Sequence, residues 1–459
     1  MQFRRCLTVF ALVGSMVLVG AVVFAGGAED STDAMAEPME EPVTLTIWAH
    51  HPEAELEKLM SDYQELHPHI SFEFLHIPWS NAGWAQKTMT GLLSDDLPDL
   101  SFSAQGGAEW SLPVRGVFAS LNRYLERDNV SLDDIPDGVL NLMVLNDQVY
   151  AIPMNTDYNL MFYNKRMFEE AGITSLPETW AEFAEATEKL TKRDADGNLT
   201  QIGLAVNNRT GNTFLGWVYA NNGNWFSRDG TTAMMASPES VEAARYLMSL
   251  RDIIGTYDEI TTFAPRARGV PDSFIQEKSA MAYFYAVTQI GRIDQNNPDL
   301  EYGVFRTPLP PGGTHGALNT GVGSYKIPAA ASHPDEAWDF LKYVYDNSLT
   351  YIVEAWKNGR AGVPARLSVL RHPDFMALHP QLPEIVETFE PISQYSQLIH
   401  IFATDVNWIN MGPAIDSFIR DIEPPEVALA QAQEKIQVEL DRIFGGLSER
   451  GIEVMLERF

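Results

Sequence analysis

Polar and aromatic side chains follow two stretches of the sequence that have the apolar pattern of buried strands. Trp48, His50 and Glu53 come at or after the end of the first stretch, and Ser103 and Gln105 come at or after the end of another. Ligands of open parallel sheets lie at the carboxyl ends of the strands. Carboxylate, amide and hydroxyl groups there can exchange hydrogen bonds with a ligand's hydroxyl groups, and an indole ring can cover a flat apolar face. These residue types are suited to a ligand that has hydroxyl groups and a flat apolar face.

Other candidates for ligand contact have a structural alternative. Asp157 follows an extended segment that ends at Pro153, and it could instead be an acid of a turn or a helix cap. Trp48 could equally be a core tryptophan, and for Trp217 the core of a helix is the commoner role. Arg360 either closes over a ligand or is a solvated loop residue. All four are retained as candidates.

The sequence does not indicate a metal site, a phosphate loop or a catalytic group. His50-His51 and His67-Pro68-His69 lie on separate segments without a coordinating spacing. The segment Asp194 to Asn198 imitates a calcium loop, but its glycine comes at the fourth position, and Asp-Gly is typical of a turn. Gly321 to Ser324 lacks the later Gly and Lys-Ser/Thr of a phosphate loop. We therefore expect no metal, no cofactor and no catalytic residue.

The charge balance argues against two classes of partner. The chain has 62 acidic and 32 basic residues, a formal net charge of −30. So acidic a protein will not bind nucleic acid or anionic lipid through bulk electrostatics. Hydrophobic residues make up 45% of the chain, which indicates a globular protein, and 459 residues predict two or three domain-sized units.

The N-terminus has the pattern of a secretory signal peptide spanning residues 1–25. Arg4 and Arg5 form a charged region, an apolar run follows, and Ala25 is a small residue at the expected cleavage point. Cys6 is the only cysteine and precedes the apolar run, so a lipid anchor at the cleavage site is not expected. The mature chain would then contain no disulfide and no cysteine nucleophile. A free exported protein is retained only inside an outer membrane, so we expect a periplasmic location.

Strand and helix patterns alternate after an acidic linker. Residues 26–42 contain six acids and no base, and such a segment cannot bury a core. The first predicted elements are strand 43–48, helix 53–66, strand 70–77, helix 84–93 and strand 98–103. Further helices are predicted at 333–345 and from Pro424 past Leu440. Strands that alternate with helices favour an α/β protein with a parallel sheet.

The stretch from Tyr163 to Phe183 is the most specific part of the sequence. It begins Tyr-Asn-Lys-Arg-Met-Phe-Glu-Glu-Ala-Gly and continues with Pro-Glu-Thr-Trp. Asn164 can cap a short helix, and Gly172 is placed to end it. Thr179 is then the N-cap of a second helix, and Glu182 completes a capping box.

This stretch resembles, residue by residue, the signature of the extracellular solute-binding proteins of sugar ABC importers. Weaker matches stand in the family's order at Trp48, Pro68, Pro98-Asp99, Ala280-Met281, Pro334 to Trp338, Gly359 with Pro364, and Glu426 with Ala428-Leu429. The resemblance implies a two-lobe α/β fold of the periplasmic-binding-protein type, in which each lobe is a mostly parallel sheet flanked by helices and hinge strands join the lobes. By this analogy lobe 1 holds residues 43–155 and 323–371, and lobe 2 holds residues 156–322 and 372–459.

The resemblance also implies a function. A substrate-binding subunit of this kind captures a mono- or oligosaccharide between two closing lobes and delivers it to permease subunits in the inner membrane. We expect a monomer without a nucleic-acid partner. Positions where the family commonly contacts sugar correspond to Ser103, Gln105, Asp157, Tyr285 and Trp408. Asn319 and Gly321, which precede a hinge strand, are further candidates.

One enzyme class stays open as the alternative. Abundant Asp and Glu could pair across a cleft, as in a secreted glycoside hydrolase. The sequence has no motif that marks such a pair, whereas the binding-protein signature is extensive. The scarcity of Lys and Arg near the candidate positions argues against a phosphorylated ligand.

Overall fold

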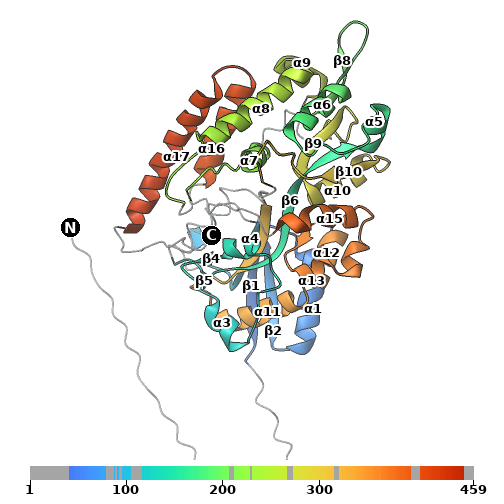
Figure 1. Ribbon diagram of the computed structural model, residues 1–459. Coiled ribbons are helices and arrows are strands. Elements are labelled where there is room, and N and C mark those ends of the chain that lie inside the picture. Colours follow the sequence, from blue (N-terminus) through green and yellow to red (C-terminus); the bar gives the residue numbers. More distant parts are fainter. Residues whose placement is uncertain are drawn as a thin grey trace, which may run out of the picture. The chain divides into compact units, whose positions relative to one another are not determined.

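The computed structural model describes residues 41–78, 87, 90, 91, 96–104, 116–205, 211–227, 230–265, 272–314, 320–360, 362–393 and 404–448 (Figure 1). Its strands are β1 Val43–Ala49, β2 Ile70–His76, β3 Leu100–Ala104, β4 Val144–Leu145, β5 Gln148–Val149, β6 Ile152–Asn164, β7 Lys192–Arg193, β8 Leu199–Leu204, β9 Ser279–Tyr285, β10 Tyr302–Phe305, β11 Thr320–Lys326 and β12 Val363–Pro364. Its α-helices are α1 Glu57–Leu66, α3 Asn122–Arg127, α4 Asp137–Leu140, α5 Lys165–Glu170, α6 Trp180–Leu190, α7 Gly211–Ala220, α8 Pro238–Ile254, α9 Tyr257–Phe263, α10 Ala286–Asn296, α11 Pro334–Asp346, α12 Ser348–Lys357, α13 Leu367–Leu370, α14 Pro373–Met376, α15 Leu382–Ser393, α16 Thr404–Ile419 and α17 Pro425–Ser448. The described residues also form the short 3₁₀ helices η1 Glu53–Glu55 and η4 Asn141–Met143.

Parallel strands form the first part of the main sheet. β1 pairs in parallel with β2 and with β3, and β11 joins β3 in the antiparallel direction. Leu45 and Ile47 of β1 are buried, as the alternation of its sequence predicts. Tyr63 of α1 contacts both Phe72 of β2 and Phe340 of α11, with ring centroids 6.3 and 5.1 Å away. These aromatic contacts fix two helices against one face of the sheet.

The 13-residue strand β6 belongs to both parts of the sheet. Its first half pairs with β11 and with β12, and its second half pairs with β9 and with β10. Figure 1 shows β6 passing from the strands near β1 to the strands near β9. β6 is therefore a strand that joins two sheet-containing lobes.

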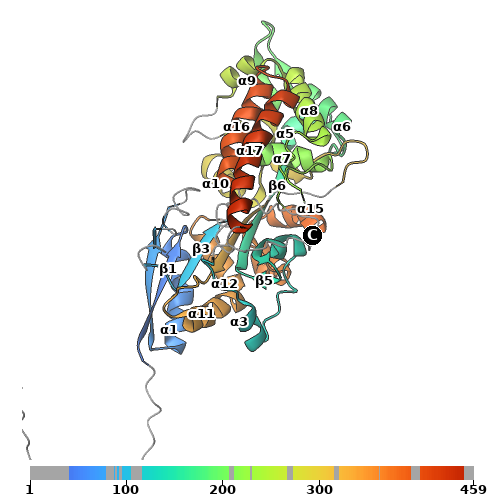
Figure 2. The ribbon, with the colours of Figure 1, turned by 90° about the vertical axis from the view of Figure 1, so that its left-hand side faces the viewer.

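Helices surround the second part of the sheet. β9 pairs antiparallel with β6, and β8 adds to β9 in parallel. Figures 1 and 2 both show α16 and α17 side by side. Between α6, α7 and α8, the ring of Trp180 stacks on Tyr246 at 4.0 Å, and Trp217 lies 5.5 Å from Tyr246. Trp217 is only 1% exposed, so it lies in the core of this lobe.

The predicted caps of the signature stretch are confirmed. Asn164 precedes α5 and its side chain accepts a hydrogen bond from the backbone N–H of Met167 at 3.0 Å. Gly172 has φ of +67°, a backbone conformation that favours glycine after a helix. Thr179 and Glu182 form the capping box of α6.

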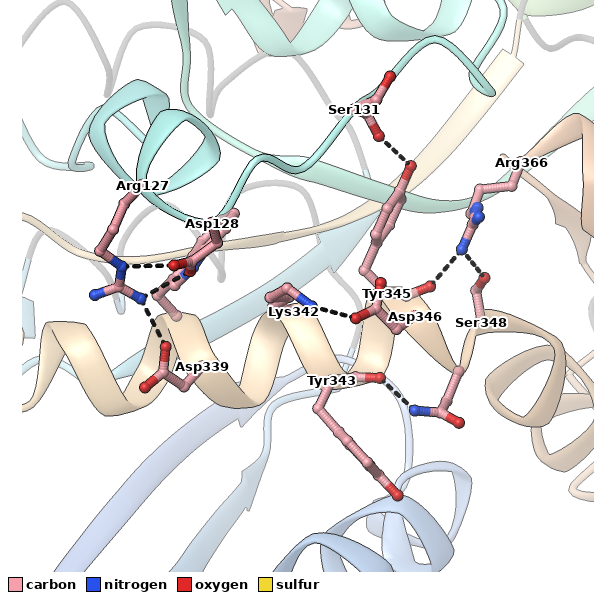
Figure 3. A network of polar contacts seen from close by, with 12 residues as sticks. Arg127, Asp128, Ser131, Asp339, Lys342, Tyr343, Tyr345, Asp346, Ser348 and Arg366 are labelled. Carbon is pink, nitrogen blue, oxygen red and sulfur yellow. Dashed lines mark hydrogen bonds and ion pairs between the residues drawn. The ribbon is translucent and has the colours of Figure 1, made fainter.

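Polar contacts hold α3 and the segment after β12 against α11 (Figure 3). Arg127 at the end of α3 donates to Asp128 and to Asp339 of α11, each at 2.8 Å. Arg366, which follows β12, donates from Nη1 to the backbone oxygen of Tyr345 at 2.9 Å. These contacts tie α3 and the segment after β12 to the same helix.

The α/β prediction is confirmed, with a difference in strand direction. Parallel pairing holds for β1 with its neighbours and for β8 with β9, but β6 runs antiparallel to β11 and β9, and β11 runs antiparallel to β3. The predicted lobe limits stay predictions. The predicted linker 26–42 and helix 84–93 lie largely outside the described residues. Within the described ranges, no helix combines the length and the apolar character needed to span a bilayer.

Replacing Trp217 by alanine should destabilise the protein strongly. Removal of a fully buried indole leaves a cavity, and such changes cost about 3–5 kcal/mol. Denaturant unfolding of Trp217→Ala measures this loss, with Leu66→Ala as a control because Leu66 is 65% exposed. A stable Trp217→Ala protein with weakened ligand binding would contradict the core assignment.

Candidate functional site

Strand register places predicted site residues on one face of the sheet. Asp157 of β6 lies opposite Gly321 of β11, and Asn159 of β6 lies opposite Tyr285 of β9. Side chains alternate between the two faces of a strand, so Asn155, Asp157 and Asn159 share one face. We call this set the hinge face: Asn155, Asp157, Asn159, Tyr285, Gly321 and Gly323. Three of the predicted ligand contacts, Asp157, Tyr285 and Gly321, therefore occupy neighbouring positions.

The hinge face continues onto the first part of the sheet. Gly323 lies opposite Asn155 on β6 and opposite Ala104 on β3. A Cβ atom at Gly323 would lie 2.3 Å from Asn155 Oδ1 and 2.6 Å from Phe102 Cζ. The absence of a side chain at Gly323 thus allows the Asn155 amide and the Phe102 ring to approach each other.

Two polar atoms of the hinge face have unused hydrogen-bonding capacity. Asn155 Oδ1 and Asn159 Nδ2 are buried and make no hydrogen bond with any residue that the structure describes. A buried polar atom without a partner costs about 1–3 kcal/mol. One acceptor and one donor therefore flank position 157 on the same strand, in a state that a new partner would stabilise.

The end of β1 places two histidines beside the hinge face. The ring of His50 lies 5.1 Å from that of Phe102. The pKa of His50 is lowered to about 3, mainly by burial and in smaller part by the charges of Arg360 and Lys326. His50 is therefore neutral at physiological pH, so its ring carries one donor and one acceptor nitrogen. His51 is fully buried, and its Nε2 forms a hydrogen bond with Tyr325 Oη at 3.0 Å.

Arg360 is held by protein groups instead of lying in a solvated loop. Its Nε donates to both carboxylate oxygens of Glu55, at 2.8 Å each, and its Nη2 donates to Tyr351 Oη at 2.9 Å. The guanidinium carbon lies 5.4 Å from the centroid of the Phe102 ring. Arg360 thus contacts the same aromatic side chain as His50.

Trp48 and Ser103 lie on the other face of the first part of the sheet. Trp48 pairs with Ser101 of β3, so it shares the face of Ser101 and Ser103, opposite to that of Phe102. Trp48 is 7% exposed, and Lys87 Nζ lies 4.1 Å from its ring centroid. Ser103 is buried and accepts a hydrogen bond from Lys326 Nζ at 2.6 Å. Their positions favour packing and internal hydrogen bonding.

Two of the remaining predicted contacts lie away from the hinge face, and the side chains of three others are not described by the structure. Glu53 is exposed at the start of η1, and Trp217 lies in the core of the other lobe. Trp408 belongs to α16, but its side chain is outside the described part of the structure, as are the side chains of Asp157 and Tyr285. Gln105 and Asn319 lie outside the described residues. Their roles as ligand contacts stay predictions.

Sequence reasoning missed Glu55, Asn159 and Lys326. For Lys326 the sequence did contain a signal, because a lysine within the predicted hinge strand that ends at Ile327 needs a polar partner when it is buried. The sequence contains no such signal for Glu55, because its partner Arg360 is 305 positions away. Asn159 could be found only from the register that places it beside Asp157.

The described residues include no cluster of three or more His, Cys, Asp or Glu side chains suited to a metal ion. One surface hollow, of about 330 Å³, is lined by Tyr163, Lys165, Phe168 and Leu176 among others. These residues belong to the C-terminal end of β6 and to α5 and its following turn, so the hollow is separate from the hinge face.

The chain belongs to the family of bacterial extracellular solute-binding proteins, whose family model matches residues 48–349. The multiple sugar-binding protein of Streptococcus mutans is 25% identical over 356 residues, which cover 72% of this chain and 78% of that protein. The sugar-binding protein MalE from Xanthomonas citri has a similar structure, with a TM-score of 0.73, 17% identity and coverage of 87% of this chain and 98% of that chain. The structure of CpMnBP1 with mannotriose bound has a TM-score of 0.69, 21% identity and coverage of 86% of this chain and 100% of that chain. These two structures establish a shared fold.

Replacing Gly323 by alanine should disturb the hinge face. The added methyl group would meet Asn155 Oδ1 and Phe102 Cζ at distances that no Cβ atom tolerates. Overpacking of this kind costs about 1–3 kcal/mol. Gly291→Ala is the matched control, because nothing lies within 4 Å of a Cβ there and alanine favours the helix α10. Thermal unfolding should show a lower melting temperature for Gly323→Ala only, and equal stability of the two variants would contradict this packing.

Proposed function

We propose that this protein is the substrate-binding subunit of a carbohydrate ABC importer and that it holds a mono- or oligosaccharide at the hinge face. The observation that supports this proposal most directly is the place of the hinge face on β6. This strand pairs with β11 on one side of the protein and with β9 on the other. A ligand on β6 can thus touch both lobes.

The mechanism is a shift between conformations. A ligand that makes contacts to both lobes only in a closed arrangement stabilises that arrangement by its difference in affinity for the two states. Closure then presents a defined surface to the permease subunits. This sequence of events needs binding and release, and no bond of the sugar is broken.

The groups near the hinge face suit a polyhydroxylated ligand. Neutral His50 and the amides of Asn155 and Asn159 can each take or give a hydrogen bond, as sugar hydroxyl groups also can. Asp157 would add a charge-assisted acceptor. The names of the similar proteins, a multiple sugar-binding protein and one solved with mannotriose, support the same ligand class.

The place of action belongs to the same proposal. We propose that the signal peptide at residues 1–25 is removed and that the protein acts as a monomer in the periplasm. It would pass its ligand to permease subunits of the inner membrane. Cell fractionation and the mass of the exported chain test this part, and a retained Met1 would contradict it.

A thermal-shift screen tests the ligand class. The panel is glucose, galactose, mannose, maltose, lactose, cellobiose, mannobiose and mannotriose. A sugar at 100 times its Kd should stabilise the native state by about 2.7 kcal/mol, which raises the melting temperature. A flat response to the whole panel would contradict sugar binding. Appearance of shorter sugars during the incubation would instead support the glycoside hydrolase alternative.

Asp157→Asn tests the predicted central contact. A carboxylate that accepts hydrogen bonds from sugar hydroxyls inside a closed site loses charge assistance when it becomes an amide. Affinity for the sugar of the panel that binds most tightly should fall roughly ten- to a hundredfold, because the binding free energy weakens by about 1.5–3 kcal/mol. Isothermal titration measures it, with the exposed Asp299→Asn as the control. Unchanged affinity together with a lower melting temperature would assign Asp157 to a structural role.

A further inference from the structure

The end of α12 fixes the backbone of Arg360. Gly359 has φ of +76°, and the backbone N–H of Arg360 donates to the oxygen of Ala355 at 2.9 Å, as in the glycine-ended helix termini called Schellman motifs. Asn358 Nδ2 donates to the backbone oxygen of Ala54 at 3.2 Å. The loop after α12 is therefore tied to η1, the short helix that carries Glu55.

Glu55 holds one edge of the Arg360 guanidinium. Both Glu55 oxygens accept from Nε at 2.8 Å, and Tyr351 Oη accepts from Nη2 at 2.9 Å. Glu55 is 0% exposed, whereas the Arg360 side chain is 27% exposed. Nη1 makes no hydrogen bond with any residue that the structure describes. One edge is thus fixed by buried groups, while the N–H groups of Nη1 keep their capacity to donate.

The position of Arg360 brings this donor next to the hinge face. The guanidinium lies over Phe102, the ring that Gly323 allows to approach Asn155. Two residues after Arg360, a Cβ atom at Gly362 would lie 3.1 Å from Asn155 Nδ2. Gly362, two positions after Arg360 in the sequence, therefore lies against the Asn155 end of the hinge face.

Glu55 also balances the charge of Arg360. Burial raises the pKa of Glu55, and the charge of Arg360 opposes that rise. Both carboxylate oxygens already accept from the guanidinium, so the pair has no net charge to offer an incoming anion. The N–H groups of Nη1 remain strong donors for a hydroxyl or ring oxygen.

We propose that Arg360 donates from Nη1 to an oxygen of the bound sugar, that Glu55 is the residue that positions it, and that this charge-balanced pair makes the site prefer neutral sugars to acidic ones. The inference rests on the proposed function and deepens it. Glu55 contributes by fixing the guanidinium and by cancelling its charge, without touching the ligand.

Glu55→Gln separates positioning from general stability. The two probes are the panel sugar that binds most tightly and the same sugar with one CH₂OH group oxidised to a carboxylate. The wild type should bind the neutral sugar at least roughly tenfold more tightly than the acidic one. In Glu55→Gln the neutral sugar should bind about tenfold more weakly, because Arg360 is no longer held in place. The preference for the neutral over the acidic sugar should shrink by a similar factor, because the charge of Arg360 is then not balanced. The matched control is Glu57→Gln, two residues away and exposed, which should leave both affinities unchanged.

Removal of Arg360 alone would leave Glu55 buried without its partner, and the protein could fail to fold. The double variant Glu55→Gln/Arg360→Met replaces the pair by neutral groups and keeps the test possible. This variant should fold and should bind the neutral sugar about tenfold more weakly than the wild type. Its affinity for the acidic sugar should not exceed that of the wild type. Wild-type preference for the acidic sugar, or an unchanged preference in Glu55→Gln, would overturn the inference while sugar binding stands. Absence of binding to either probe in the wild type would overturn the proposed function itself.

Discussion

The pairing of β6 with strands of both lobes is the constraint on which the rest of the structure depends. Asn155 and Asp157 pair with β11, whereas Asn159 pairs with β9. A single strand therefore carries residues that pair with strands of both lobes. Alternation along that strand then decides which side chains share a face. Gly321 and Gly323 on the neighbouring strand add no side chains over this face, so the polar groups of β6 stay uncovered by β11.

Burial of the polar groups that follow β1 costs free energy, so these groups need well-placed partners. The Glu55 carboxylate is removed from water, and the free-energy cost of its desolvation is offset only when its partners form hydrogen bonds of good geometry with it. Arg360 provides two contacts of 2.8 Å, and Tyr351 takes a further one from the guanidinium. Apolar side chains could fill the same volume without this cost, so stability alone does not account for an ion pair at this place. A role in holding a donor beside the hinge face does account for it.

Local signals in the sequence were sufficient for some features and not for others. The caps at Asn164 and Thr179 depend on residues within three positions, and both were predicted correctly. The positions of strand-end residues in the sequence do not tell which face of the sheet a side chain occupies, and the structure places Trp48 and Ser103 on the face opposite to Phe102. The irregularity in register between Gly323 and Ser324 also has no local signature, although it decides that Gly323 lies opposite Asn155. Contacts between distant segments, such as Glu55 with Arg360, are tertiary and were not predictable from one sequence.

The unmet hydrogen bonds on β6 connect ligand binding with movement of the lobes. Asn155 Oδ1 and Asn159 Nδ2 are buried and have no hydrogen-bond partner among the described residues, and they lie on either side of the position where β6 changes from pairing with β11 to pairing with β9. Each such atom raises the free energy of this arrangement relative to one in which it finds a partner. A ligand oxygen, or a rearranged neighbouring strand, would supply one. In the proposed mechanism, binding and hinge movement therefore involve the same atoms, and a ligand that satisfies them changes the balance between conformations by acting on the strand that joins the lobes.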